Sequence, residues 1–194
     1  MVRLRALWHV TRRMGKQMSL NMTRVKFPQI HPKIETKRLI LREITHDDTA
    51  AIFSNFSDPD VANWFFDKPH SRTEQTSKVI DDFILKFKQG EGLTWAITLK
   101  EDGRVIGTCG YENIEIGNQG EIGFDLAKEC WGKGYMRESL AAIIDFGISN
   151  LDLLKVEAHT NSNNVRAKRL LEKLGFQLDK VSKGNDHYIL SQKT

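Results

Sequence analysis

The chain has 194 residues, of which 40% are hydrophobic and 28% charged, so it is long enough for one domain with a buried core. Its two cysteines, Cys109 and Cys130, show no metal-ligand spacing. This excludes a disulfide scaffold and predicts reduced thiols in a cytoplasmic protein without a metal. No apolar run approaches the length of a bilayer span, so we expect no membrane-spanning segment.

The formal charge of +4 is concentrated at the N-terminus. Residues 1–34 contain eight basic side chains and no acid, whereas the rest of the chain holds 21 basic and 25 acidic residues. The main body therefore does not predict a nucleic-acid-binding surface. We interpret residues 1–34 as a basic N-terminal extension, mostly flexible or loosely docked, and residues 35–194 as a single domain.

The composition of the extension allows other interpretations. A basic, acid-free stretch is also typical of an organelle presequence or of a segment that touches an anionic surface, whereas its apolar core is too short for a secretory signal. We favour an extension upstream of the natural start, because Met14, Met18 and Met22 each offer a later initiation point.

The first half of the chain predicts a strand followed by two helices. Residues 38–44 alternate apolar and charged side chains, as a half-buried strand does. Thr45 and Asp48 have the spacing of a capping box and predict the start of a first helix. Ser71 and Glu74 have the same spacing and predict the start of a second helix.

The second half predicts a hairpin and then alternating strands and helices. Asp102-Gly103 joins two strand-like runs, at 94–100 and 104–116, which is a strong hairpin signal. The order of elements predicts one mixed α/β domain. The later segments are a strand at 120–127, a helix after 134, a strand at 154–160, a helix after 164 and a closing hairpin of 176–182 and 187–192.

The most informative stretch is the junction at which Gly132 and Gly134 flank Lys133, just before a helix. Glycine is a poor helix former, so its presence there needs a reason. Without a Cβ, the backbone N–H groups of a helix start can approach an anion closely, and Lys133 adds a positive charge. The junction predicts a pyrophosphate-binding loop, with a flexible turn as the alternative. The usual dinucleotide and triphosphate motifs are incomplete here, so ordinary sites of those kinds are not expected.

Three motifs together resemble the GNAT acyltransferase superfamily. T-x-R-L-x-L-R lies at 36–42, a loop of the form [Q/R]-x-x-G-x-[G/A] falls on 129–134, and N…L-x-K-L-G-F lies within 164–176. Their order and spacing are similar to those of the RimJ/RimL-like branch, the ribosomal-protein N-terminal acetyltransferases and their small-molecule relatives. The resemblance runs from about residue 35 to residue 191. It departs from the loop pattern at Glu129, where the family commonly has Gln or Arg.

The resemblance implies an α/β fold with a bent, mostly antiparallel sheet of about seven strands, flanking helices and two parallel strands that splay apart. Acetyl-CoA would enter that splay as a co-substrate, with no metal. Its pantetheine would lie beside residues 124–126 and its pyrophosphate on residues 131–136. The implied cofactor-binding residues are Phe124, Asp125, Leu126, Trp131, Gly132, Lys133, Gly134, Tyr135, Met136, Asn161 and Asn164.

Acetyl transfer to an amine needs a base for the amine and a proton for the leaving thiolate. Glu121 resembles the strand glutamate that acts as the base in histone-type members, and Glu112 on the preceding strand is the reserve. A purely structural carboxylate is the alternative for Glu121.

The proton donor is less defined by the motifs. Ala167 and Leu171 occupy the positions at which many relatives place a serine or a tyrosine. Ser162 is then the candidate donor, with Tyr188 or water as alternatives. Asn164 is expected to cap the following helix, in addition to any role in cofactor binding.

Acceptor selection is expected from the first two helices and the loop between them. Trp64, Phe65 and Phe66 would form an aromatic wall if they face the cleft, and packing into the core is the alternative. Tyr111 and Asp186 are further candidates for the rim of the site.

These features predict an acetyl-CoA-dependent N-acetyltransferase that moves an acetyl group directly to a primary amine in a ternary complex. The acceptor is either a protein or peptide N-terminus, such as that of a ribosomal protein, or a small amine. A non-catalytic acyl-CoA-binding sensor or scaffold is the alternative, because both usual donors are absent. We expect a cytoplasmic monomer or homodimer whose catalytic domain binds no nucleic acid. A third interpretation has residues 1–34 anchoring the domain to RNA or a membrane.

Overall fold

The computed structural model describes residues 26–115 and 118–191. The first 25 residues of the predicted extension lie outside the described residues. Within the described ranges, no helix is long and apolar enough to cross a membrane.

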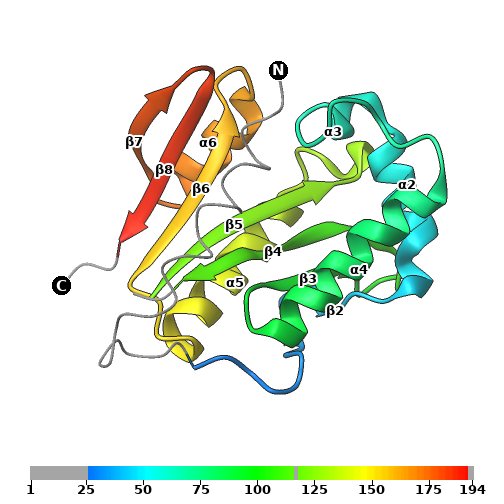
Figure 1. Cartoon of the computed structure of the whole chain (residues 1–194), viewed down its shortest axis with the longest axis horizontal. Helices are drawn as coiled ribbons and strands as arrows, with labels where there is room; N and C mark the ends of the chain where they lie inside the picture. Colours follow the sequence, from blue (N-terminus) through cyan, green and yellow to red (C-terminus); the bar gives the residue numbers. More distant parts are fainter. Residues whose placement is uncertain (1–25, 116–117, 192–194) are drawn as a thin grey trace.

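A mixed sheet forms the centre of the domain, with helices on both of its faces (Figure 1). Its strands lie in the order β1-β2-β3-β4-β5-β6-β8-β7, and neighbouring strands are antiparallel except for β5 and β6. The expected number of about seven becomes eight, because a two-residue strand pairs with β2 at one edge. The strands are β1 (Ile34–Glu35), β2 (Leu39–Glu43), β3 (Leu93–Leu99), β4 (Val105–Glu115), β5 (Gln119–Leu126), β6 (Lys155–Asn161), β7 (Gln177–Ser182) and β8 (Asn185–Ser191).

The parallel pair β5–β6 separates part-way along its length. Residues 119–122 pair with residues 155–158. Beyond them β5 continues only beside β4, as far as Leu126, and β6 continues only beside β8, as far as Asn161. Figure 1 shows the two strands diverging from this shared segment. The splay that the resemblance implied is therefore confirmed.

Helices cover the two faces of the sheet with separate hydrophobic clusters. The larger cluster joins the sheet to α5 and α6, and the smaller one lies beneath α2 and α4. Figure 1 shows α4 and α2 on the near face and α5 behind the sheet. The helical segments are η2 (His46–Asp48), α2 (Thr49–Ser57), α3 (Pro59–Ala62), α4 (Thr73–Gln89), η3 (Lys128–Cys130), α5 (Tyr135–Asn150) and α6 (Val165–Lys173).

One of the two predicted helix caps is correct and the other is displaced by one residue. Asp48 accepts a hydrogen bond from the Thr45 amide at 2.9 Å, as a capping box requires. At the start of α4, Gln75 accepts from the amides of Ser71 and Arg72 at 2.9 and 3.1 Å. The prediction for Glu74 was wrong because the N-cap is Arg72, which places Gln75 three residues later.

Residues 26–33, the last part of the predicted extension, pack against the domain. The Phe27 ring lies 5.5 Å from the ring of Phe87. His31 contacts both Phe87 and Trp95, with ring centres 5.0 and 5.5 Å apart. The Trp95 indole also donates to the Pro32 carbonyl at 2.6 Å. This segment therefore forms part of the packed surface beside α4 and β3.

Tyr111 belongs to the core and not to the rim of a site. Its side chain is 0% exposed, and its hydroxyl donates to the Ile143 carbonyl of α5 at 2.9 Å. A Cβ on Gly147, also in α5, would overlap this hydroxyl. The prediction that Tyr111 contacts an acceptor was therefore wrong, since strand alternation turns the residue towards α5.

Candidate active site

A pocket of about 420 Å³ lies beside the end of β5, beyond the point at which β6 leaves it. Residues 124–126 of β5 form one wall, and residues of the loop and first turn of α5 form a second. One face of α6 and the segment around α3 complete it. The pocket thus depends on the separation of the two parallel strands.

The glycine loop turns the chain into α5 through two left-handed residues. Gly132 and Gly134 have φ angles of +74° and +81°, which residues with a Cβ adopt only at a cost. Gly134 is the N-cap of α5, and its carbonyl accepts the Glu138 amide at 3.1 Å. The amides of residues 135–137 precede this first helical bond and point out of the helix start. The loop therefore has the local backbone geometry that the predicted pyrophosphate-binding loop needs.

Two residues just before β2 hold this loop in place. Arg38 donates from Nη1 to the Lys133 carbonyl at 2.8 Å and from Nε to Glu138 at 2.7 Å. Its guanidinium lies 4.4 Å from the centre of the Tyr135 ring. Thr36 also donates to Glu138, at 2.6 Å. Burial alone would raise the pKa of Glu138, but the bonds from Thr36 and Arg38 lower it, so the carboxylate stays charged. The T-x-R-L motif thus positions the glycine loop.

The pocket is lined by cationic side chains that sequence reasoning missed. Arg166, Arg169 and Lys173 have the spacing of one helical face and line the pocket from α6, and Arg137 lines it from α5. Among the residues that the structure describes, Asp125 is the only acidic residue in the lining. The spacing of these basic residues in the sequence could have indicated the face, but not which element it would meet.

Trp131, at the start of the glycine loop, links two walls of the pocket. The Trp131 indole donates to the Leu126 carbonyl of β5 at 2.8 Å. The Arg166 guanidinium of α6 lies 4.4 Å from the centre of the same ring, in a cation–π contact. The pocket therefore has a fixed aromatic surface beneath a positive charge. Together with the other cationic side chains of the lining, it suits a ligand that carries several negative charges.

Most of the predicted cofactor-binding residues meet in this pocket. Lys133 and Asn161 do not line it. The Lys133 carbonyl faces Arg38, and the Asn161 side chain accepts from the Asn163 amide at 2.9 Å. Asn164 caps α6 as predicted, because its side chain accepts from the Ala167 amide at 3.1 Å. The predicted residues that line the pocket are Phe124, Asp125, Leu126, Trp131, Gly132, Gly134, Tyr135, Met136 and Asn164.

The aromatic triplet after α3 is divided between the pocket and the core. Trp64 and Phe65 are 40% and 37% exposed and line the pocket. Phe66 packs instead against Phe56 and His70, with ring centres 5.0 and 4.4 Å apart. The expected aromatic wall therefore consists of two residues rather than three.

Two predicted carboxylates lie where β5 and β6 separate. Glu121 accepts a hydrogen bond from Asn113 at 3.3 Å, one residue before the last β5–β6 pair. Glu112 lies at the bulge of β4, and its carboxylate stands over Gly123, where a Cβ would overlap it. Gly123 is the first residue of β5 beyond that last pair. Both carboxylates are therefore placed close to the start of the splay.

Ser162 is tied to the neighbouring strand rather than directed into the pocket. Its hydroxyl donates to Asp186 at 2.5 Å. Asp186 is 1% exposed and also pairs with Lys168 at 2.6 Å. Tyr188, the other donor considered, is 1% exposed, and its hydroxyl donates to Glu172 at 3.4 Å. Neither residue lines the pocket, and the burial of Asp186 also removes it from the rim.

Asp125 is a buried acid whose carboxylate is bonded on the α2 side of the sheet. Asn55 of α2 donates to it at 3.0 Å, and the Thr108 amide donates at 3.2 Å. The Thr108 hydroxyl donates as well. Burial nevertheless raises the pKa of Asp125 to about 6, although these hydrogen bonds act in the opposite direction. Its side chain thus belongs to a hydrogen-bond network on the α2 side of the sheet.

The fold and the pocket define an acyl-transferase type of domain, and comparison with known proteins identifies the family. Residues 38–177 match the family model described as "Acetyltransferase (GNAT) domain". The chain therefore belongs to the GNAT family and is an acetyltransferase, as its motifs predict.

A curated relative supports this assignment, and solved structures share the fold. The uncharacterised N-acetyltransferase YoaA of Bacillus subtilis is 32% identical over 77% of this chain and 85% of its own length. A GNAT-family acetyltransferase from Bacillus anthracis is 18% identical, with a TM-score of 0.73, over 82% of this chain and 98% of its own. RimL, a ribosomal-protein acetyltransferase solved in complex with coenzyme A, has a TM-score of 0.73 and 19% identity over 82% of this chain and 98% of its own.

We predict that Asp125 makes the free energy of unfolding fall as the pH rises from 4 to 7. Because its folded pKa of about 6 lies above the unfolded value of about 3.9, the folded state binds more protons between these values. A shift of about two units corresponds to about 3 kcal/mol, present below pH 4 and lost as the pH passes 6. Denaturant unfolding across this pH range should show this loss of unfolding free energy in the wild type and not in Asp125→Asn.

The matched control is Asp145→Asn, at an exposed position of α5. This variant should keep the pH dependence of the wild type. If Asp125→Asn kept it as well, the carboxylate would not be the group responsible.

Proposed function

We propose that this protein is an acetyl-CoA-dependent N-acetyltransferase that moves the acetyl group directly to a primary amine in a ternary complex. The observation that carries the proposal is the cationic pocket that opens beside the splay of β5 and β6. Coenzyme A combines several phosphate charges with a long, amide-bearing arm. The pocket offers complementary groups to both parts.

The phosphates would be held by the helix start and by α6. The amides of residues 135–137 and the positive end of the α5 dipole suit a pyrophosphate. The cationic residues on the pocket face of α6, at positions 166, 169 and 173, suit the remaining phosphate charge. The edge of β5 at 123–126 has no pairing with β6, so its backbone groups that point away from β4 are available to the amides of the pantetheine arm, apart from the Leu126 carbonyl, which accepts from Trp131.

The reaction would take place where the strands separate. The amine nitrogen attacks the thioester carbonyl, so that a C–N bond forms, and the C–S bond then breaks. Glu121 accepts the amine proton, directly or through water, and Glu112 is the second candidate because its carboxylate stands over Gly123. The thiolate takes a proton from water, since the Ser162 hydroxyl already donates to Asp186.

The acceptor is a protein N-terminus or a small amine. The carboxylates of Glu112 and Glu121 favour a cationic amine in either case. The similarity to RimL, a ribosomal-protein acetyltransferase, supports a protein N-terminus by analogy. The exposed rings of Trp64 and Phe65 would contact bound ligand from the α3 side.

A non-catalytic acyl-CoA sensor is the second candidate. Ala167 and Leu171 are buried and apolar, at 7% and 0% exposure, so neither can supply a proton to the thiolate. With Ser162 bonded to Asp186, the structure shows no dedicated proton donor among the predicted residues it describes. Such a protein would bind acetyl-CoA without turning it over.

The first test is a thiol-release assay with acetyl-CoA and a panel of amines: peptides with free N-termini, polyamines, amino acids and aminoglycosides. Calorimetry measures acetyl-CoA binding in parallel. We expect binding together with turnover on at least one class of acceptor. Binding without turnover on any of them supports the sensor, and absence of binding contradicts both candidates.

We predict that Gly134→Val abolishes acetyl-CoA binding, because a branched side chain would cover the amides of the helix start. The matched control is Gly103→Val in the turn between β3 and β4. Gly103 has a φ of +75°, close to the +81° of Gly134, and its Cβ would meet nothing within 4 Å. Both variants should therefore carry a similar strain of about 1–2 kcal/mol. Calorimetry should show lost binding only for Gly134→Val, and unchanged affinity in that variant contradicts the loop assignment.

We predict that Glu121→Gln lowers kcat severalfold or more at neutral pH and leaves the affinity for acetyl-CoA nearly unchanged. The amide can still accept the hydrogen bond from Asn113, so the variant removes basicity and keeps the shape. Steady-state kinetics from pH 6 to 9 measure the effect, with Glu101→Gln in the β3–β4 turn as a control. If only Glu112→Gln lowers kcat, the base is Glu112, and if neither does, no strand carboxylate acts as the base.

A further inference from the structure

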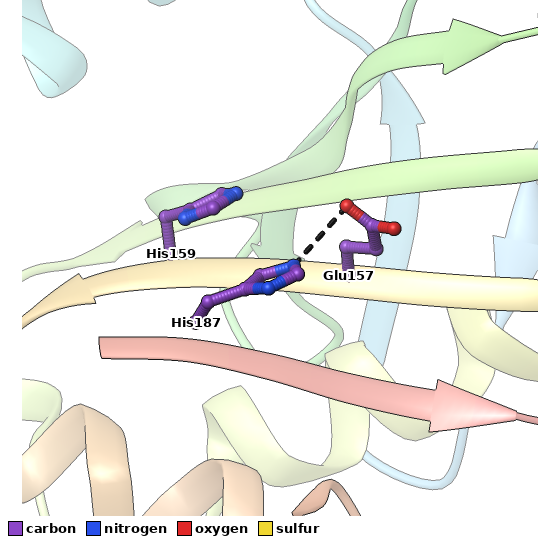
Figure 2. A group of neighbouring side chains, drawn as sticks. All are labelled: Glu157, His159 and His187. Atoms are coloured by element: carbon purple, nitrogen blue, oxygen red, sulfur yellow. Dashed lines mark hydrogen bonds and ion pairs between the residues drawn. The ribbon is translucent and has the colours of Figure 1, made fainter. Parts of the chain in front are cut away.

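Strands β6 and β8 carry three potential metal ligands on the face of the sheet opposite α5 and α6. Glu157 and His159 are two residues apart on β6, so their side chains project to the same face. His187 is the antiparallel partner of His159 on β8. Figure 2 shows all three side chains on one side of these two strands. Their candidate ligand atoms lie within 4.8 Å of one another.

His187 contacts a carboxylate through each of its ring nitrogens. Its Nε2 lies 3.2 Å from a Glu157 oxygen, and its Nδ1 lies 3.1 Å from an Asp179 oxygen. A neutral imidazole has a single N–H group, so it can donate to only one of the two carboxylates. At the other contact, two lone pairs face each other unless a second proton or a metal ion lies between them.

Asp179 is placed to orient His187 for a metal. A carboxylate that accepts the N–H of one ring nitrogen fixes the tautomer and leaves the other nitrogen as a ligand. Here Nδ1 faces Asp179 and Nε2 faces Glu157, whereas the His159 ring lies over the face of the His187 ring. Second-sphere carboxylates of this kind are common around histidine ligands.

Glu157 is held as an anion with one oxygen towards His187. Lys155 pairs with its Oε1 at 2.5 Å, whereas Oε2 faces His187. Glu121, its register partner on β5, adds a further carboxylate on this face. The surroundings are therefore attractive to a cation despite Lys155.

His159 must turn to complete the site. Its ring is stacked on that of His187, with centres 4.4 Å apart and planes 8° from parallel. Two parallel rings cannot both hold one ion in their planes, so binding requires a change of the His159 side-chain torsions. The residue is exposed on the surface of the sheet.

We propose that Glu157, His159 and His187 form a binding site for a divalent transition-metal ion, with zinc as the best match. Two imidazoles and one carboxylate are a ligand set that zinc accepts, and three protein ligands leave a fourth position for water or another ligand. Calcium and magnesium prefer oxygen ligands and are not expected to bind here. None of the three residues lines the pocket beside β5, and the proposal differs from the sequence-based expectation of no metal.

The experiment uses the full chain, freed of metal with a chelator and then titrated with zinc chloride against a chromophoric competitor. We expect one zinc ion per chain, no binding of magnesium, and visible absorption bands when cobalt takes the place of zinc. His159→Ala and His187→Ala should each lower the zinc affinity at least about 100-fold, and Asp179→Asn by about 10- to 100-fold through the loss of orientation.

The control is His46→Ala, because His46 is an exposed histidine that pairs with Asp81 at 3.2 Å in another part of the fold. This variant should bind zinc as the wild type does. Since β6 is an inner strand of the sheet, His159→Asn and Glu157→Gln serve as milder variants, with circular dichroism to check folding. Zinc should also raise the Tm of the wild type but not that of the site variants.

Two results would overturn the proposal. The first is unchanged zinc affinity in folded His159→Ala and His187→Ala. The second is no stoichiometric zinc binding by the wild type. Loss of zinc binding in the site variants says nothing about acetyl-CoA affinity, so calorimetry with acetyl-CoA on the same variants keeps the two proposals separate.

Discussion

The early end of the pairing between β5 and β6 is the constraint on which the rest of this structure depends. Backbone groups that stop pairing at residues 122 and 158 must find other partners or a ligand. The separation also leaves room between the end of β5 and α6, and the start of α5 lies beside that room. A fully paired ladder would have used the same backbone groups internally and left no place for the pocket.

Charge is distributed unequally around this opening. The pocket wall made by α5 and α6 is cationic, which complements the phosphates of the proposed co-substrate. Carboxylates lie near the start of the splay and along the opposite face of the sheet, where a cationic amine would be attracted. The hydrogen bonds of Arg38 to the Lys133 carbonyl and to Glu138 fix the glycine loop against the sheet. The backbone groups of the glycine loop are therefore held by the rigid elements on either side of it.

Local sequence patterns predicted those parts of the site that depend on residues close together in the sequence. The glycine loop, the cap by Asn164 and the hairpin at Gly103 each follow from conformational preferences within a few positions. Predictions that needed the direction of a side chain were less successful. Tyr111 faces the core, and Phe66 packs beside His70, because the neighbours that bury them come from distant segments.

The sequence by itself determined most of the order of elements, the mixed α/β class, the family and the glycine loop before α5, since these rest on periodicity and on glycine at a helix start. The tertiary structure alone decided which side chains meet. It brought the basic face of α6 to the pocket, bonded Ser162 to Asp186, and placed His187 beside Glu157 across two strands. The physical reason is that strand register and helix packing are set by long-range burial. A one-residue shift in register would turn the same side chains to the other face of the sheet.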